Sequence, residues 1–300
     1  MELFERYYSK VFLVTTAALL LCAAIGRQPG SGVAMWLLVL GVVLLGLPHG
    51  ALDPMLARKA FGNRPFFSLG SFAAAYAVLA LLYAGLWILL PIVGLASFLA
   101  ISAYHFGGDW SGRGRVSGRF AYGCTIVTLP ALWHPMEVAR IYSALVGPDA
   151  DRFVQLSQIA AVAAAIFGIY SAFSQWNERR EDLFEFAGIL AGAAFLPPLL
   201  FFFCYFCLLH SPRHLLETAR SVGLTDLLAI VRTAFPLVCA TLILAAVSWF
   251  SLPAGREGQR VLQVLFVGLA ALTVPHMMLE KICQRSTAAV NTTLTRVSAN

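Results

Sequence analysis

Histidines are the residues of this chain whose type and spacing most clearly predict chemistry. His49 lies in the segment Pro-His-Gly-Ala-Leu-Asp, and His105 lies in Tyr-His-Phe-Gly. His210 and His214 form His-Ser-Pro-Arg-His, and their i, i+4 spacing puts both rings on one face of a helix, where two imidazoles can bind one metal ion. His276 lies late in the last apolar segment. These side chains predict a metal centre.

Carboxylates follow these histidines at helical spacing. The pairs are His49 with Asp53, His105 with Asp109, His214 with Glu217, and His276 with Glu280. A carboxylate that accepts the second ring N–H of a metal-binding histidine fixes its tautomer and raises its basicity. We therefore expect the four carboxylates, together with His276, to form a second layer around the metal-binding histidines and to hold them in position. In the alternative interpretation, the carboxylates anchor helix ends by pairing with nearby arginines.

The ligand type limits which metals and which reactions are plausible. An all-imidazole site suits iron, zinc or copper, and imidazole alone does not choose among them. Zinc hydrolysis normally needs a carboxylate base near the ion, and the His-Glu-x-x-His pattern of metalloproteases is absent from the sequence. The pattern therefore favours oxidative chemistry.

Composition indicates that these histidines are held in a membrane protein. Of 300 residues, 59% are apolar and 12% are charged, against roughly 45–50% and about 25% in soluble domains. The net charge of +6 comes from basic residues at the ends of apolar segments, which sets membrane topology and does not form a nucleic-acid surface. We predict one membrane-embedded domain over residues 1–300, with residues 282–300 as a flexible C-terminal tail.

The apolar segments predict an all-α, polytopic bundle, because lipid leaves no backbone group unsatisfied and a spanning helix needs about 20 apolar residues. Ten helices are expected, at residues 11–27, 33–55, 66–90, 92–108, 118–134, 153–175, 182–196, 198–218, 227–251 and 260–281.

Prolines determine how these segments are counted. Pro91 and the pair Pro197-Pro198 are expected in tight turns, because proline lacks a backbone donor and disfavours helix before it. Most basic residues then fall on one side, so we predict a multi-pass protein of the cytoplasmic membrane with both termini in the cytoplasm. If Pro197-Pro198 only kinks one long helix, nine spans remain and the C-terminus lies outside. With ten spans, five histidines reach a similar depth near the cytoplasmic side, and only His134 lies on the far side.

The motifs around His49, His105, His210 and His214 resemble those of the Brp/Blh family of bacterial and archaeal β-carotene 15,15′-dioxygenases. The resemblance covers most of the chain and several separated motifs. It implies a membrane enzyme that uses non-haem Fe²⁺ and O₂ to cleave β-carotene, or a related carotenoid, at its central double bond into two all-trans-retinal molecules. It also implies that these four histidines are the iron ligands and the catalytic site, and that a retinal-binding opsin consumes the product.

Aromatic residues near the histidines are candidates for the wall of a carotenoid pocket, since such pockets are apolar and aromatic. They are Tyr104, Phe106, Phe203, Tyr205 and Phe206. In the alternative interpretation, these side chains face lipid or pack in the protein core.

Three other functions remain compatible with the sequence. One is a carotenoid-cleaving oxygenase with a different substrate, and another is a di-metal membrane hydroxylase or desaturase, whose sites use more histidines than this chain has. The third is a transporter with histidine-lined proton sites, although no repeat between the two halves is visible.

Overall fold

The computed structural model describes residues 2–62, 68–110, 116–173, 180–254 and 256–298. These residues form helices and no strand. In chain order the elements are α1 Glu2–Ala24, α2 Ser31–Gly41, η1 Val42–Gly46, α3 Leu47–Gly50, α4 Asp53–Phe61, α5 Leu69–Leu89, α6 Pro91–Phe106, η2 Gly107–Asp109, α7 Val116–Thr128, α8 Pro130–Trp133, α9 Pro135–Val146, η3 Gly147–Asp149, α10 Ala150–Phe173, α11 Arg180–Phe195, α12 Pro198–Phe202, η4 Phe203–His210, α13 Ser211–Ser221, α14 Leu227–Ser251 and α15 Glu257–Ser298.

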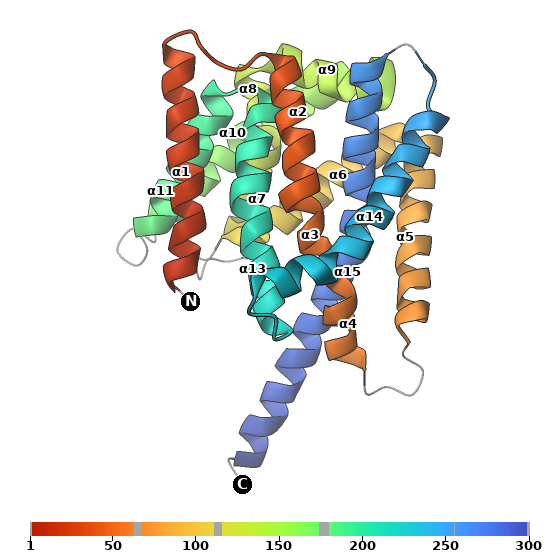
Figure 1. Ribbon diagram of the computed structural model, residues 1–300. Helices are drawn as coiled ribbons and strands as arrows, with labels where there is room; N and C mark the ends of the chain where they lie inside the picture. The colour runs from red at the N-terminus through yellow and green to blue at the C-terminus, as the bar shows by residue number, and fades with distance from the viewer. Residues whose placement is uncertain (1, 63–67, 111–115, 174–179, 255, 299–300) are drawn as a thin grey trace.

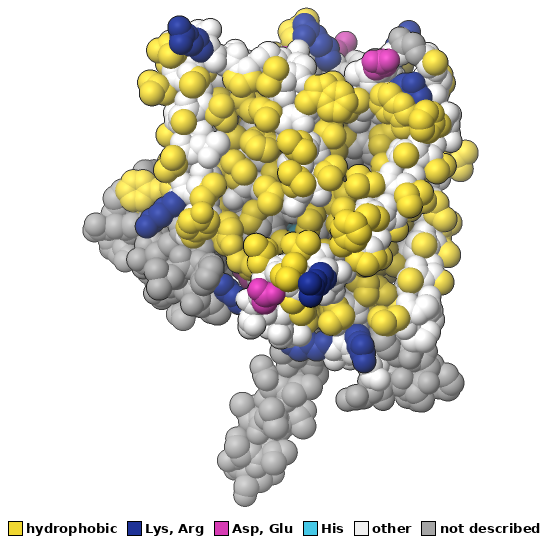
Figure 2. All heavy atoms as spheres, in the orientation of Figure 1, with side chains coloured by type: hydrophobic (Ala, Val, Ile, Leu, Met, Phe, Trp, Pro, Cys, Tyr) yellow, Lys and Arg dark blue, Asp and Glu magenta, His cyan; other side chains and the backbone are white. Residues whose placement is uncertain are grey.

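The chain is an all-α, multi-pass membrane bundle. Within the described residues, eight helical stretches are long and apolar enough to cross a membrane, and a shorter apolar helix covers Leu183–Phe195. Figure 1 shows most of them running along one common direction, with α14 crossing obliquely. Figure 2 shows a broad band of hydrophobic side chains, with basic and acidic side chains gathered toward its two ends. An exposed apolar belt of this extent is typical of a protein solvated by lipid.

Each of the ten predicted segments is mostly helical where the structure describes it, but two details of the prediction were wrong. The segment 118–134 is not one span, because α7 ends at Thr128 and α8 begins at Pro130. The prediction also missed α9, which lies at the upper end of the bundle in Figure 1. A tight turn at Gly147, whose φ is +74°, separates α9 from α10. Glycine reaches this conformation without a Cβ penalty.

The proline turns are confirmed. Helix α5 ends at Leu89 and α6 begins at Pro91, while α11 ends at Phe195 and α12 begins at Pro198. The second turn reverses the direction of the chain. Contacts across it show this: Gly192 packs on Phe201, and Glu185 pairs with Arg213 farther along the returning helix. This hairpin supports two segments where the nine-span alternative required one kinked helix.

The N-terminal end of α1 and the C-terminal end of α15 lie at the same end of the bundle (Figure 1). Helix α15 continues to Ser298 and projects beyond the other helices, so the segment expected as a tail is helical over most of its length. Its predicted flexibility stays a prediction.

Candidate metal centre

Five helical elements bring five histidines together. His49 comes from α3, His105 from the end of α6, His210 from the end of η4, His214 from α13 and His276 from α15. The ring centroid of His210 lies 4.8 Å from that of His105, 4.6 Å from that of His214 and 5.8 Å from that of His49. The His276 ring lies 5.1 Å from His49 and 5.7 Å from His105. The predicted convergence of five histidines is therefore present in the structure.

His134 stands apart from this cluster. It precedes α9 as its N-cap residue, and its Nδ1 lies 4.0 Å from a carboxylate oxygen of Glu137. Figure 1 places α9 at the opposite end of the bundle from α13, which carries His214. His134 is thus a natural control for substitutions within the cluster.

Two of the histidines lie in or just after π-helical turns. η1 covers Val42–Gly46 and leads into His49, whereas η4 covers Phe203–His210 and ends on His210. A π-helical turn inserts an extra residue into the helix and shifts the direction of the side chains after it, and such turns are frequent at functional sites. The amino-acid sequence carries no local pattern that predicts them.

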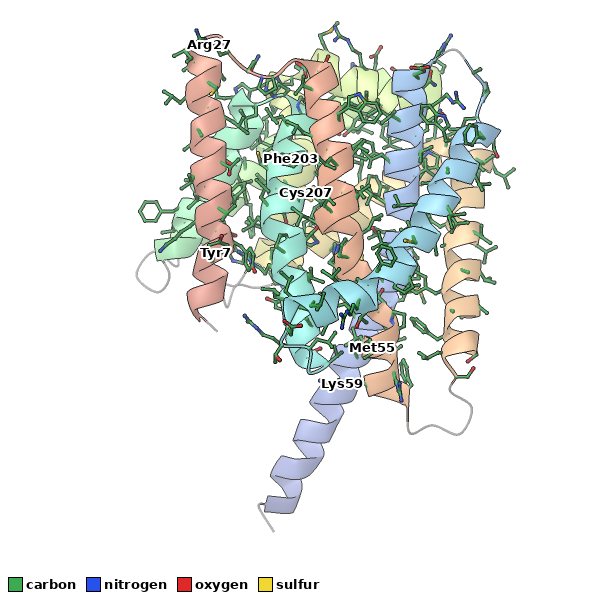
Figure 3. The ribbon with its side chains drawn as sticks, viewed as in Figure 1. Tyr7, Arg27, Met55, Lys59, Phe203 and Cys207 are labelled. Carbon is green, nitrogen blue, oxygen red and sulfur yellow. The ribbon has the colours of Figure 1, made fainter. Side chains whose placement is uncertain are left out.

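Glycines let the two π-helical segments approach closely. A Cβ atom on Gly41 would lie 2.8 Å from Cys207 Sγ and from the ring of Phe203, and one on Gly46 would lie 2.9 Å from the ring of Phe206. Figure 3 shows Phe203 and Cys207 beside α2. Because these glycines lack a side chain, the helix that leads to His49 packs directly on the helix that carries the pair of histidines.

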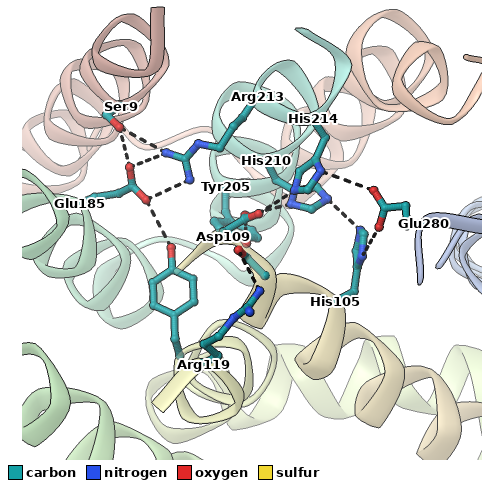
Figure 4. A network of polar contacts seen from close by, with 12 residues as sticks. Ser9, His105, Asp109, Arg119, Glu185, Tyr205, His210, Arg213, His214 and Glu280 are labelled. Carbon is teal, nitrogen blue, oxygen red and sulfur yellow. Dashed lines mark hydrogen bonds and ion pairs between the residues drawn. The ribbon is translucent and has the colours of Figure 1, made fainter. Parts of the chain in front are cut away.

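Asp109 is the hydrogen-bonding centre of the cluster (Figure 4). Its side chain is fully buried. Its Oδ2 accepts from the Tyr205 hydroxyl at 2.6 Å and pairs with His210 Nδ1 at 2.9 Å, while its Oδ1 pairs with His214 Nε2 at 2.9 Å. One carboxylate therefore fixes two imidazoles and a phenol.

Asp53 plays the corresponding part for His276. Both Asp53 oxygens lie 2.9 Å from His276 Nδ1, and the Tyr76 hydroxyl donates to Oδ2 at 3.0 Å. Asp53 and His276 are 1% and 5% exposed. A buried carboxylate with these donors holds the His276 ring in one orientation.

Two of the four carboxylates support histidines other than those predicted from spacing, whereas Glu280 lies beside its predicted partner, His276. Asp109 binds His210 and His214 instead of His105, and Asp53 binds His276 instead of His49. Glu280 lies between three rings, 3.6 Å from His276 Nε2, 3.8 Å from His214 Nδ1 and 4.0 Å from His105 Nδ1. The fourth predicted carboxylate, Glu217, is exposed on α13.

Three of the histidines have Nδ1 bonded to oxygen, which leaves Nε2 to bind a metal. His49 Nδ1 pairs with the carbonyl oxygen of Gly46, His210 Nδ1 with Asp109 and His276 Nδ1 with Asp53. His210 Nε2 faces His105 Nε2 at 3.1 Å. Neighbouring imidazole ligands of one divalent metal ion stand about this far apart, because a metal–N bond is about 2.1 Å long and cis ligands subtend about 90°.

The donors fall into two separate groups that could each hold a metal. His49, His105 and His276 each offer one ligand atom within 4.8 Å of the other two, and Asp109, His210 and His214 do the same. The buried Nε2 of His276 lacks a hydrogen-bond partner among the described residues. An unsatisfied buried imidazole nitrogen beside other imidazoles fits a metal centre.

Three of the predicted pocket aromatics pack around His210. Phe206 stacks on its ring with centroids 5.6 Å apart, Phe106 meets it edge-on at 4.9 Å, and Tyr205 stacks at 6.0 Å. The other two lie elsewhere, since Phe203 packs at Gly41 and Tyr104 is 49% exposed. The ammonium of Lys281 lies 4.2 Å from the Tyr104 ring centroid.

A buried ion pair beside the cluster was missed by the sequence analysis (Figure 4). Arg213 Nη2 donates to Glu185 Oε2 at 2.7 Å and to Ser9 Oγ at 3.4 Å, and the Tyr122 hydroxyl donates to Glu185 Oε1 at 3.4 Å. These contacts join α1, α7, α11 and α13. The available signal was Arg213 itself, a cation between two of the clustered histidines in a largely apolar segment.

The fold and the site together define an integral-membrane helical protein with a buried histidine and carboxylate centre. The chain belongs to the β-carotene 15,15′-dioxygenase family, whose model matches residues 40–284 and so includes all five clustered histidines. The resemblance inferred from the motifs is confirmed. The protein is a carotenoid cleavage dioxygenase.

Two curated relatives carry the same description. The β-carotene 15,15′-dioxygenase of the uncultured marine bacterium 66A03 is 28% identical over 252 residues, which cover 81% of this chain and 92% of the relative. The probable β-carotene 15,15′-dioxygenase Blh of Halobacterium salinarum is 26% identical over 282 residues, which cover 80% of this chain and 81% of the relative. No solved structure matches the chain.

Proposed function

We propose that this protein is a membrane non-haem iron dioxygenase that cleaves β-carotene with O₂ at its central double bond to give two all-trans-retinal molecules. The observation that carries the metal part is the arrangement of His49, His105 and His210. Two of their Nδ1 atoms are bonded to oxygen acceptors, and the Nε2 atoms of His105 and His210 stand 3.1 Å apart. These three belong to the four histidines that the family resemblance implies as ligands.

Fe²⁺ bound there would supply the redox chemistry that lets O₂ react with a polyene double bond. The overall reaction adds both oxygen atoms across the broken carbon–carbon bond without net proton transfer. The residues are therefore needed to hold and shield the centre, and no general acid or base is required. Asp109 and the Gly46 carbonyl oxygen fix the imidazoles, while Phe106 and Phe206 exclude water beside His210.

The apolar surface of the bundle supports a substrate taken from lipid. Carotenoids are long, rigid and dissolved in the bilayer, so a site between membrane helices can take them without passage through water. We place the protein in the cytoplasmic membrane with both termini in the cytoplasm, which agrees with the positive-inside rule and with the two ends of the chain lying at one end of the bundle. A retinal-binding opsin is the proposed consumer of the product.

The test is expression in bacteria that accumulate β-carotene. Cells with the natural chain should lose β-carotene and gain retinal, whereas cells with His210→Ala should keep β-carotene while the protein still inserts in the membrane. His134→Ala, at the far end of the bundle, should behave as the natural chain. Unchanged β-carotene in cells with the natural protein in the membrane would contradict the proposal.

A further inference from the structure

Four phenylalanine rings form a row that leads from the histidine cluster toward the opposite end of the bundle. They are Phe206, Phe202, Phe266 and Phe98, which we call the phenylalanine row. We propose that one half of the carotenoid lies along this row and that the far end of the row determines how long that half can be. The inference rests on the proposed function and names where the substrate binds at that site.

The row begins at the ring of His210. Phe206 stacks on His210 with centroids 5.6 Å apart and an interplanar angle of 21°, and Phe202 stacks on Phe206 at 5.1 Å and 11°. The three residues are four positions apart along α12 and η4, so they share one face of the helix. Rings stacked in this way turn their edges to the side, where they can contact the π face of a conjugated polyene.

Two other helices continue the row and close it. Phe202 meets Phe266 of α15 with centroids 5.8 Å apart, and Phe266 meets Phe98 of α6 at 6.3 Å. Phe98 in turn meets Trp87 at 5.7 Å. Trp87 is 3% exposed, and its indole N–H donates to the carbonyl oxygen of Leu145 at 3.4 Å. Trp87 is therefore held in place and forms the far end of the row.

The length of the row matches half of a carotenoid. Phe98 precedes His105 by seven residues and Phe266 precedes His276 by ten. At about 1.5 Å per residue, the far end lies roughly 10–15 Å from the histidines along the helix axes. β-Carotene is about as long as the hydrocarbon core of a bilayer, roughly 30 Å, so each half is about 15 Å long. A substrate centred at the histidines would place one end ring beside Phe98 and Phe266.

The helices beside the row leave it accessible from lipid. Phe98 and Phe202 are partly exposed, whereas Phe206 and Phe266 are buried. Helix α2 packs on α12 and η4, while α15 packs on α4, α5, α9 and α14. Figure 1 shows α2 and α15 apart from each other, with α6 behind them. Because α2 and α15 have different neighbours, they can separate to admit a carotenoid from the bilayer without disrupting the packing of either helix.

The experiment compares two substrates of the purified, Fe²⁺-loaded full chain in detergent: β-carotene, and 8′-apo-β-carotenal, which has one complete half and one shortened half without a ring. Phe98→Trp fills the far end of the row. It should lower kcat/KM for β-carotene at least about tenfold. For the apocarotenal, kcat/KM should change less than about twofold, because the shortened half still fits beside the row. The chelator-stripped protein should show the same preference in carotenoid binding, measured by quenching of tryptophan fluorescence.

Phe153→Trp is the matched control, because Phe153 is a partly exposed ring on α10 whose ring contact is Tyr142. It should keep the substrate ratio of the natural chain. Phe266→Trp serves if Phe98→Trp does not insert in the membrane, and it should show the same selective loss.

Three results would overturn the assignment and leave the proposed function standing. They are an equal loss for both substrates in Phe98→Trp or Phe266→Trp, unchanged cleavage of β-carotene in these variants, and an altered substrate ratio in Phe153→Trp. A natural chain that cleaves neither substrate when loaded with Fe²⁺ would instead overturn the proposed function itself.

Discussion

Replacing Asp109 with asparagine tests how the carboxylate controls the metal centre. Asp109 is fully buried and contacts Tyr205, His210 and His214 at 2.6 to 2.9 Å. Asparagine keeps the shape but replaces one acceptor oxygen with a donor and removes the charge. One buried donor then loses its acceptor, which costs about 1–3 kcal/mol of stability. The imidazole of His210 also becomes less basic, which should weaken metal binding about 10- to 100-fold, or by about 1.4–2.8 kcal/mol.

The assay is anaerobic titration of the chelator-stripped protein with Fe²⁺, together with thermal unfolding in detergent. Tyr205→Phe is the matched control, because it removes one donor but leaves the charged carboxylate on both histidines. It should weaken Fe²⁺ binding by less than about tenfold. The reasoning would be refuted if Asp109→Asn bound Fe²⁺ as tightly as the natural chain, or if Tyr205→Phe lost as much affinity.

Three further predictions concern packing and topology. Gly123→Ala should destabilise the bundle by about 3 kcal/mol or more, because the new Cβ would lie 1.8 Å from the carbonyl oxygen of Ala103. Gly85→Ala is the control: its Cβ would meet nothing within 4 Å, so this variant should be neutral or stabilising. Equal unfolding temperatures for the two variants would contradict this prediction. Glu185→Ala should cost about 3–5 kcal/mol by leaving Arg213 buried without its partner, and denaturant unfolding that shows no loss would refute the role of the pair. Reporter fusions at the two termini should give the same cytoplasmic signal, and opposite signals would disprove the proposed topology.

The sequence was sufficient to predict the cluster of histidines, because helix length and basic residues decide which helix ends share one side. His49, His105, His210 and His276 all lie late in their apolar segments, so an even number of crossings between them brings them to one depth. The hairpin at Pro197-Pro198 was predictable for a similar reason, since proline ends the preceding helix.

The partners of Asp53 and Asp109 could not be predicted, because the helices break where the spacing rule assumed continuity. The backbone turns at Ala51 and Leu52 after His49, and η2 covers Gly107–Asp109 after His105. Each break directs the carboxylate away from its sequence neighbour and toward a histidine on another helix. Tertiary contacts of this kind join residues more than 100 positions apart and have no local signature.

The π-helical turns and the ion pair were missed for related physical reasons. η4 lies in a continuous run of apolar residues whose composition suits any helix type, and its register is set by close packing against Gly41 and Gly46. Glu185 and Arg213 meet only because the proline hairpin folds α11 back on α13.

The central claim is tested most directly by giving the purified, Fe²⁺-loaded protein β-carotene under ¹⁸O₂ and reducing the products at once, so that aldehyde oxygen cannot exchange with water. Mass spectrometry should then find two retinol molecules per β-carotene consumed, each with one ¹⁸O atom, and no product from the His210→Ala protein. Fragments of unequal length, or ¹⁸O in only half of the product, would contradict central cleavage by a dioxygenase.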